Sequence, residues 1–289
     1  CMMSIAKGAV RGGLPKIRSV YAHLAPAEQK VAKYVLENGE QVIYMSVTQL
    51  AEVSGVGEST VIRFCQNAGF SGYQELKLVL ARDFVEPDHH ISEGITSTDS
   101  LAVMAKKVVY ANAKALEDTF KVLDLEQLET AITAITRARK VEFYGVGASG
   151  VTAVDAKYRF MRLGVLCDAF TDSHMQAMSA MTLQPVDVAV GISFSGSTKD
   201  VVASLTNAKE RGATVICITA YDRSPIARVA DVKLIAASSE TPLGSGSLRS
   251  KIAQLYILDV LYTGVALRLG AVGQRYNELT AEAVLDKLY

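Results

Sequence analysis

Apolar side chains recur at helical spacing through residues 16–84 of the chain. Pro26 suits a first helical turn, and the apolar positions that follow it in Ala27–Leu36 are Val31, Ala32, Val35 and Leu36. After a Phe70-Ser71-Gly72 turn, Tyr73–Phe84 has the same amphipathic pattern. The pattern predicts an all-α domain over residues 1–84.

The segment Val47–Gln66 predicts a helix-turn-helix. Gly55 falls where the chain must turn sharply between two helices, a position that favours a positive φ. Apolar residues on both sides of the turn are expected to lock the helices together: Leu50, Ala51, Val56, Val61 and Phe64. The second helix is left with outward-pointing side chains, as a DNA-reading helix needs: Glu58, Ser59, Ile62, Arg63 and Gln66. The alternative is an ordinary helical hairpin.

The pattern changes beyond residue 84. Residues 85–100 have no periodicity and are rich in Pro, Gly, Ser, Thr and Asp, which predicts a linker. Helical patterns resume at Leu101–Leu123 and Leu125–Arg137. Short apolar runs, most of them β-branched, then alternate with helical or turn-rich segments: Val141–Tyr144, Val165–Cys167, Val188–Ile192, Thr214–Thr219 and Val232–Ile235. Such runs are typical of a parallel sheet covered on both faces. Residues 101–289 are therefore expected to form an α/β doubly wound domain of about five parallel strands. A final long helix is expected at Ser247–Arg268.

Charge and cysteine content limit the function classes. The 289 residues have a formal net charge of zero, and residues 1–84 carry nine basic and seven acidic side chains, a weak bias that fits DNA contact without arguing for it. The cysteines are scattered, and three lie in apolar patterns: Cys65, Cys167 and Cys217. We therefore expect buried thiols in a reducing cytoplasm, with neither a disulfide framework nor a zinc site.

No membrane segment is expected. Residues 1–25 lack the apolar run of a signal peptide. The longest apolar stretch, Ile252–Leu269, is interrupted by Asp259 and Arg268, which favours a core helix over a membrane span.

Two loops that follow predicted strands carry the candidate chemistry. They are Gly145–Gly150, sequence GVGASG, and Ser193–Thr198, sequence SFSGST. Open parallel sheets bind ligands at the carboxyl ends of their strands. Glycines and hydroxyls just before a helix offer backbone N–H groups and side-chain donors to an anion.

The first loop also matches the dinucleotide pattern G-x-G-x-x-G, and Asp168 follows Gly150 by 18 residues. An NAD-dependent oxidoreductase is therefore one alternative. A dinucleotide enzyme does not need four hydroxyls on a second strand end, whereas a phosphorylated sugar uses one loop for the sugar and the other for the phosphate. The purely structural interpretation is that the loops are two tight turns with Ser residues as helix caps.

Further candidates lie outside these loops. His174, beside Ser173, is the sole histidine of the predicted α/β domain, and could donate to a sugar oxygen or be structural. Lys251, near the start of the last helix, could reach a phosphate or be a solvated surface lysine. The expected ligand-binding residues are Gly147, Ser149, Ser173, His174, Ser193, Ser195, Ser197, Thr198 and Lys251.

Taken together, the motifs resemble the RpiR family of bacterial sugar-responsive transcription regulators, which join a helix-turn-helix to a SIS (sugar isomerase) domain. The resemblance runs from about residue 16 to 268 and rests on four segments: Ser59–Lys77, Phe143–Gly150, Ile192–Val202 and Ser250–Leu261. It implies that Ser149 belongs to the first SIS loop and that Ser193, Ser195 and Thr198 hold a phosphate. It also implies that Ser59, Thr60 and Arg63 begin the recognition helix.

The chain departs from the family pattern at several positions. Gly57 stands where the family often has a capping Ser, and Lys251 where relatives often have Arg. Catalytic SIS domains carry an active-site Glu or His, but the segment after Asp172 has no Glu and only His174. The departures favour a sensor over an isomerase, so no catalytic residue, metal or cofactor is expected.

The leading hypothesis is a DNA-binding regulator of carbohydrate metabolism that senses a phosphorylated sugar. A homodimer or higher homo-oligomer on a palindromic operator is implied, because one short helix reads few base pairs. The alternative is a sugar-phosphate isomerase with a helical assembly domain. The expected DNA-binding residues are Thr48, Glu58, Ser59, Thr60, Arg63, Gln66 and Lys77.

Overall fold

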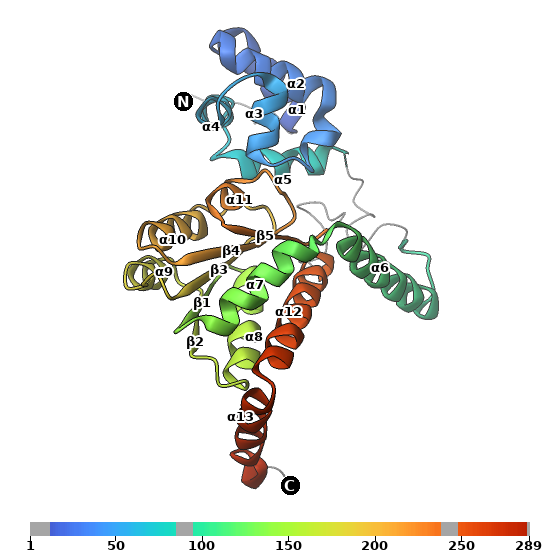
Figure 1. Ribbon diagram of the computed structural model, residues 1–289. Helices are drawn as coiled ribbons and strands as arrows, with labels where there is room; N and C mark the ends of the chain where they lie inside the picture. Colours follow the sequence, from blue (N-terminus) through green and yellow to red (C-terminus); the bar gives the residue numbers. More distant parts are fainter. Residues whose placement is uncertain (1–11, 85–94, 238–247, 288–289) are drawn as a thin grey trace, which may run out of the picture. The chain divides into compact units, whose positions relative to one another are not determined.

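The computed structural model describes residues 12–84, 95–237 and 248–287 (Figure 1). They divide into two compact units with a boundary between Leu101 and Ala102. Most of the predicted linker, residues 85–94, lies outside the described residues. Each unit is described by itself.

The first unit is helical, as predicted. Its elements are α1 (Gly13–Val20), the 3-10 turn η1 (Tyr21–His23), α2 (Pro26–Val42), α3 (Val47–Ser54), α4 (Glu58–Asn67) and α5 (Tyr73–Phe84). Pro26 is the first residue of α2, where its missing N–H costs nothing. The apolar side chains that the helical spacing selects meet in one core, which includes Ile17, Val31, Leu50, Phe64 and Leu76.

Helices α3 and α4 form the predicted helix-turn-helix. Ser46 caps α3 through its Oγ, which accepts a hydrogen bond from the Gln49 N–H at 3.1 Å. Gly55 ends α3 in the left-handed region, with φ 63° and ψ 41°, which turns the chain towards α4. Leu50, Ala51, Val61 and Phe64 are buried, and Val56 packs against them. Ile62, which was expected to point outward, also packs against this core.

The second unit is a parallel sheet between two layers of helices (Figure 1). Its strands are β1 (Val141–Tyr144), β2 (Cys167–Phe170), β3 (Val188–Ile192), β4 (Thr214–Thr219) and β5 (Val232–Ile235), in the order β2-β1-β3-β4-β5. The predicted doubly wound sheet is confirmed. Only β2 is displaced from its predicted span, because Val165 and Leu166 precede the register that pairs Cys167 with Val141.

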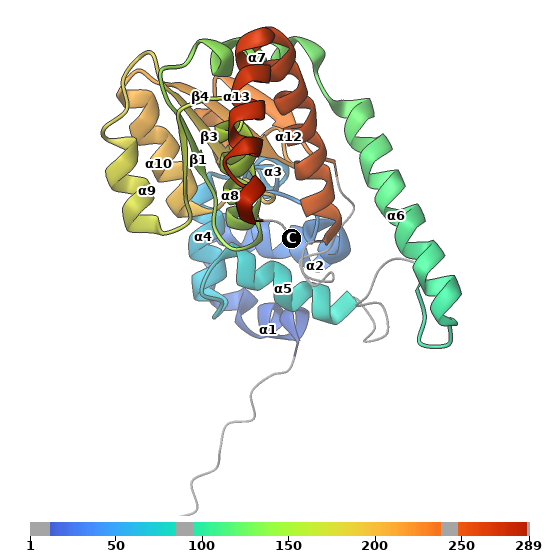
Figure 2. The same ribbon diagram turned by 90° about the horizontal axis from the view of Figure 1, so that it is seen from below.

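The helices cover the sheet on both faces. One face packs against α7 (Leu125–Arg137), α8 (Ala148–Met161) and α12 (Leu248–Leu269). The other packs against α9 (Ser173–Ala180), α10 (Lys199–Glu210) and α11 (Pro225–Val229). The unit also contains α6 (Leu101–Val122), α13 (Ala271–Glu282) and the 3-10 turn η4 (Leu285–Lys287); Figure 2 shows α6 running away from the sheet.

Helix α12 is a core helix on one side. By length and composition it is the one described helix that could cross a membrane. Of its apolar stretch, 33% is buried inside the protein. Ala253, Ile257, Leu261 and Val265 are fully buried against the sheet. Its inward face therefore belongs to the core of the second unit, as the sequence predicts.

The described cysteines are free thiols. Cys65 and Cys217 are buried, and burial raises the pKa of each to about 12. Cys167 is half-buried, and burial raises its pKa to about 11. Cys1 lies outside the described residues. Cys65 and Cys217 are therefore buried as expected, whereas Cys167 is only half-buried, and the raised pKa of each favours the protonated thiol at neutral pH.

Lys77, which was predicted to contact DNA, lies inside the helical unit. Its side chain is buried, its Nζ donates to the Met45 carbonyl oxygen at 2.9 Å, and Nζ lies 5.7 Å from the Tyr73 ring centre. Burial lowers the pKa of the Lys77 ammonium from 10.5 to about 8. In this conformation the ammonium ties α5 to the connection between α2 and α3 and does not reach the surface where a phosphate would bind.

The lowered pKa of Lys77 predicts a pH-dependent stability. The unfolded chain binds more protons than the folded chain between about pH 8 and pH 10.5, so the free energy of unfolding rises with pH in that window. A pKa difference of this size corresponds to about 3 kcal/mol. We expect the melting temperature of Lys77→Met, relative to wild type, to be higher at pH 7 than at pH 10. Scanning calorimetry of both full-length proteins measures this, and a difference independent of pH would contradict it.

Candidate functional site

The exposed face of α4 is the candidate DNA-contacting surface. Ser59, Arg63 and Gln66 are exposed along it, at helical spacing. The Arg63 side chain is 63% exposed, and its Nε lies 3.6 Å from Oε1 of the buried Glu28 on α2. Glu28 also accepts hydrogen bonds from Asn67 Nδ2 at 3.0 and 3.2 Å. The guanidinium is therefore held at the surface by its Nε side and keeps most of its donors towards solvent.

The other predicted DNA-binding residues of this segment are less exposed. Thr48 is buried and its hydroxyl donates to Glu58 Oε1, so it links the start of α3 to the start of α4. Glu58 is half-buried in the first turn of α4, where the helix dipole favours a carboxylate. Thr60 is half-buried as well. Gly57 precedes α4 without a side-chain cap.

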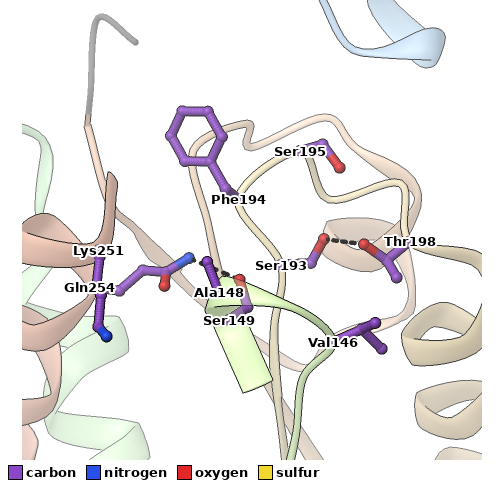
Figure 3. A pocket seen from close by; sticks show the side chains of 9 residues that line it. All are labelled: Val146, Ala148, Ser149, Ser193, Phe194, Ser195, Thr198, Lys251 and Gln254. Atoms are coloured by element: carbon purple, nitrogen blue, oxygen red, sulfur yellow. Dashed lines mark hydrogen bonds between the residues drawn. The ribbon is translucent and has the colours of Figure 1, made fainter. Parts of the chain in front are cut away.

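The second candidate site is a cavity of about 200 Å³ at the carboxyl ends of β1 and β3. The strand order reverses between these neighbouring strands, since β2 lies on one side of β1 and β3, β4 and β5 on the other. Open α/β sheets bind ligands at such a point. Figure 3 shows the lining residues, which are Val146, Ala148, Ser149, Ser193, Phe194, Ser195, Thr198, Lys251 and Gln254.

The first loop brings Ser149 into the cavity without using it as a cap. Gly147 precedes α8 with φ 61°, a conformation that favours glycine. Helix α8 therefore starts without a side-chain cap. A Cβ on Gly145 would lie 2.5 Å from the Ser149 carbonyl oxygen, so this position also requires glycine. The Ser149 Oγ accepts a hydrogen bond from Gln254 Nε2 at 3.3 Å (Figure 3).

The second loop is fixed by a close approach at Gly196. It has φ 63°, and a Cβ there would lie 2.1 Å from the Ser224 Oγ. The Ser193 and Thr198 hydroxyls share a hydrogen bond of 2.9 Å across the loop (Figure 3). Thr198 stands directly before α10 but makes no side-chain cap. The Ser195 Oγ accepts from the Ser197 N–H at 3.3 Å, and the Ser197 hydroxyl donates to the Ser195 carbonyl oxygen at 3.2 Å. These two hydroxyls therefore brace the turn itself, whereas the hydroxyls of Ser193 and Thr198 bond to each other and cap no helix.

Helix α12 closes the cavity with Lys251 and Gln254. Lys251 is half-buried and is the one ionisable side chain among the nine lining residues of the described chain. Gln254 is almost fully buried, and its Oε1 accepts from Thr152 Oγ1 at 3.2 Å. The amide therefore connects α12 to the start of α8 through two hydroxyls.

Five of the nine predicted ligand-binding residues line the cavity: Ser149, Ser193, Ser195, Thr198 and Lys251. Gly147 and Ser197 belong to the same loops but not to the lining. Ser173 and His174 begin α9 outside the lining, and His174 is exposed. Asp168, the acid of the dinucleotide pattern, pairs with Lys157 at 2.6 Å. That carboxylate is engaged by the protein, which weakens the dinucleotide interpretation.

Sequence reasoning missed Gln254 and Phe194. Gln254 is a polar side chain inside the apolar run after Ile252, one helical turn beyond Lys251, and that spacing was a usable signal. Phe194 packs edge-on against Tyr221, with ring centres 6.1 Å apart. An aromatic residue in a serine loop gave no such signal. Among the described residues, no group of three or more His, Cys, Asp or Glu gathers in a way that could hold a metal ion.

Comparisons with known proteins assign both units. Residues 11–87 match the helix-turn-helix domain of the rpiR family, and residues 134–264 match the SIS domain. A helix-turn-helix transcriptional regulator of Caldanaerobacter subterraneus subsp. tengcongensis is 41% identical over 94% of this chain and 96% of its own. The regulator HexR of Pseudomonas aeruginosa is 34% identical over 96% of both chains.

Solved structures agree with this assignment. The Vibrio vulnificus NanR protein, complexed with ManNAc-6P, has a TM-score of 0.83 and 29% identity, covering 96% of this chain and 99% of that one. The sugar isomerase domain of an RpiR transcription factor from Sphaerobacter thermophilus has a TM-score of 0.57 and 25% identity, covering 62% of this chain and 98% of that one. The chain belongs to the RpiR family of helix-turn-helix transcriptional regulators with a SIS domain, and is a regulator and not an enzyme.

Proposed function

We propose that this regulator senses a phosphorylated sugar in the cavity at the β1 and β3 loops, and that occupancy changes its affinity for operator DNA in the cytoplasm. The observation that carries the proposal is the convergence of hydroxyls and one lysine on a single small cavity. The contributing donors are Ser149, Ser193, Ser195, Thr198 and Lys251.

The second loop is the phosphate-binding part of the proposal. Helix α10 starts at Lys199, and the N–H groups of its first turn have no acceptor within the helix. A helix N-terminus favours an anion, and the three hydroxyls of Ser193, Ser195 and Thr198 add donors to it. Lys251 supplies a compact positive charge across the cavity. Together they suit a phosphate better than an uncharged group.

The rest of the lining suits a sugar. Phe194 and Val146 offer apolar surface to the C–H groups of a ring, while Gln254 and Ser149 offer polar groups to its hydroxyls. The Vibrio vulnificus relative is complexed with ManNAc-6P, which supports a phosphorylated hexose derivative as the ligand class. The lining contains no Asp, Glu or His to move a proton, which suits a sensor.

The proposed DNA complex contains two copies of the chain. One α4 reads few base pairs, and a two-fold pair of such helices matches a palindromic operator. The sugar changes operator affinity only if it binds the DNA-competent and DNA-incompetent states unequally. HexR is a helix-turn-helix transcriptional regulator and NanR is complexed with ManNAc-6P, which supports the coupling of a sugar phosphate to DNA binding.

We expect Arg63→Ala to weaken operator binding by about 1–3 kcal/mol if the guanidinium reads a base edge. Because Glu28 keeps its bonds to Asn67, the helical unit is expected to remain folded. Arg211→Ala, which removes an exposed positive charge from the sheet unit, is the matched control. Fluorescence anisotropy on operator DNA and circular dichroism measure both effects. Unchanged operator affinity in Arg63→Ala would contradict the proposal that Arg63 contacts DNA.

We expect Ser195→Ala to weaken binding of a phosphorylated sugar at least about tenfold, since a lost donor to a charged oxygen costs roughly 1.5–3 kcal/mol. Calorimetry with N-acetylmannosamine 6-phosphate and with the unphosphorylated sugar is a suitable first test, after a thermal-shift panel of sugar phosphates. The unphosphorylated sugar should bind weakly to wild type and be less sensitive to the substitution.

Ser173→Ala removes a comparable hydroxyl from the start of α9, outside the cavity lining, and should leave binding unchanged. Ligand-free DNA affinity should also be unchanged in Ser195→Ala. Equal binding of phosphorylated and free sugars would mean that this loop does not hold a phosphate. Unfolding of Ser195→Ala would mean that the hydroxyl has a structural role.

A further inference from the structure

The carboxylate of Glu28 is buried behind the candidate DNA-contacting face of α4. Glu28 is the third residue of α2, and its side chain is 4% exposed. Its Oε2 accepts from the Ala25 N–H at 3.3 Å, which satisfies a backbone donor at the start of α2. A carboxylate removed from water also needs charged or strongly hydrogen-bonding partners, because burial otherwise disfavours its ionised form. Those partners come from α4.

Two residues of α4 meet this carboxylate. Asn67, the last residue of the helix, donates from Nδ2 to Glu28 Oε1 at 3.2 Å and to Oε2 at 3.0 Å. Arg63, one helical turn earlier, places its Nε 3.6 Å from Oε1. The Arg63 side chain is exposed and the Glu28 side chain is not, so the guanidinium extends from a buried anchor into solvent. The contact is made by Nε, the inner nitrogen of the guanidinium.

The packing of α4 does not depend on this ion pair. Val61, Phe64 and Cys65, on the inward face of α4, are fully buried in the core of the helical unit. Apolar burial of this kind is the dominant favourable contribution to packing. The charge of Glu28 therefore has its main effect on the outward face of α4, where it restricts the orientation of Arg63.

We propose that Glu28 is a positioning residue for DNA reading, which holds Arg63 by Nε so that its terminal nitrogens contact a guanine edge in the major groove. This rests on the proposed function, which places the exposed face of α4 on DNA. Two parallel N–H donors of a guanidinium match O6 and N7 of guanine. An arginine whose orientation is restricted in the free protein loses less side-chain entropy when it binds.

The carboxylate also argues against a phosphate as the partner of Arg63. A phosphate is attracted by net positive charge, and such contacts carry no sequence information. Glu28 offsets part of the charge of Arg63, which weakens attraction to a phosphate. A base edge is neutral and demands a fixed donor geometry, so the same ion pair favours base reading over backbone contact.

The first experiment compares selected with scrambled DNA. A randomised duplex library enriched with wild type supplies a selected duplex, and a scrambled duplex of the same length and composition measures non-specific binding. Fluorescence anisotropy gives both affinities, and their ratio is the discrimination. Glu28→Gln keeps the size of the side chain and removes its charge. We expect its discrimination to fall about two- to tenfold, the cost of ordering one long side chain. Its affinity for the scrambled duplex should rise, because a negative charge beside Arg63 is lost.

A double-mutant cycle separates positioning from a structural role. In the Arg63→Ala background, Glu28→Gln should have no effect on discrimination, because the side chain that it positions is gone. A structural role would lower discrimination equally in both backgrounds, and that result would overturn the proposal. Glu37→Gln is the matched control, since Glu37 lies on the same helix and pairs with Lys33. It should change neither affinity.

A modified base tests the contact without changing Glu28. 7-Deazaguanine replaces the N7 acceptor by C–H. Placed at each guanine of the selected duplex in turn, it should weaken wild type about fivefold or more at one guanine per α4 and leave Arg63→Ala unaffected there. Arg63→Lys keeps the charge but not the planar fork, so it should lose discrimination and retain affinity for the scrambled duplex. Insensitivity of wild type at every guanine would overturn the proposal in favour of a phosphate contact.

Two outcomes separate this proposal from the proposed function. If wild type enriches a sequence but Glu28 and Arg63 act independently, the positioning role fails while operator binding stands. If discrimination depends on the Glu28–Arg63 pair but calorimetry detects no binding of N-acetylmannosamine 6-phosphate or other sugar phosphates, sensing fails while the positioning role stands. A wild type that enriches no sequence from the library contradicts both.

Discussion

The parallel pairing of β1 with β3 is the constraint on which the candidate ligand site depends. The two strands are adjacent in the sheet, with Val141 opposite Val188, although β2 lies between them in sequence. Their carboxyl ends therefore meet at the point where the strand order reverses, and helices leave this point on opposite faces of the sheet. Both loops must turn from a strand into a helix within a few residues. That requirement explains the glycines of the first loop and Gly196 of the second, and it leaves the hydroxyls of both loops around a common space.

The hydroxyls at this point differ from ordinary capping residues in what they bind. Asp172 and Asp124 cap α9 and α7 through their carboxylates, with N–H to Oδ1 distances of 2.9 to 3.1 Å. Thr198 holds the same position before α10, yet its hydroxyl bonds to Ser193. Ser149 lies inside the first turn of α8, and its hydroxyl bonds to Gln254. A hydroxyl that does not cap its helix leaves the helix N–H groups without that partner. On the proposed function, the first-turn N–H groups of α10 and the helix dipole would together favour an anion in the cavity.

Local sequence rules predicted much of this protein, and tertiary packing explains the exceptions. The αL turn at Gly55 and the two strand-end loops follow from residue types at fixed spacing, because backbone geometry is decided locally. Lys77 and Thr48 were expected at a DNA surface, but burial is decided by which helix packs over a residue. Helix α5 turns Lys77 inward to the Met45 carbonyl oxygen, between α2 and α3. Gln254 was missed for a related reason. Its partners Ser149 and Thr152 are about one hundred residues away in sequence, and only the packing of α12 on α8 brings them together.

Helix α12 extends from the candidate ligand cavity along the core of the sheet unit. Lys251 and Gln254 line the cavity, while Thr263 and Leu267, further along the same helix, are exposed on its outward side. A rigid helix transmits a small displacement along its length, because its hydrogen-bonded turns move together. On the proposed function, a ligand that draws Lys251 towards a phosphate would therefore act on the whole of α12. Such a displacement changes DNA affinity only if the two paired α4 helices fit the operator better in one arrangement of the dimer than in the other. On this hypothesis, α12 is the element whose equilibrium both the sugar and the operator bias.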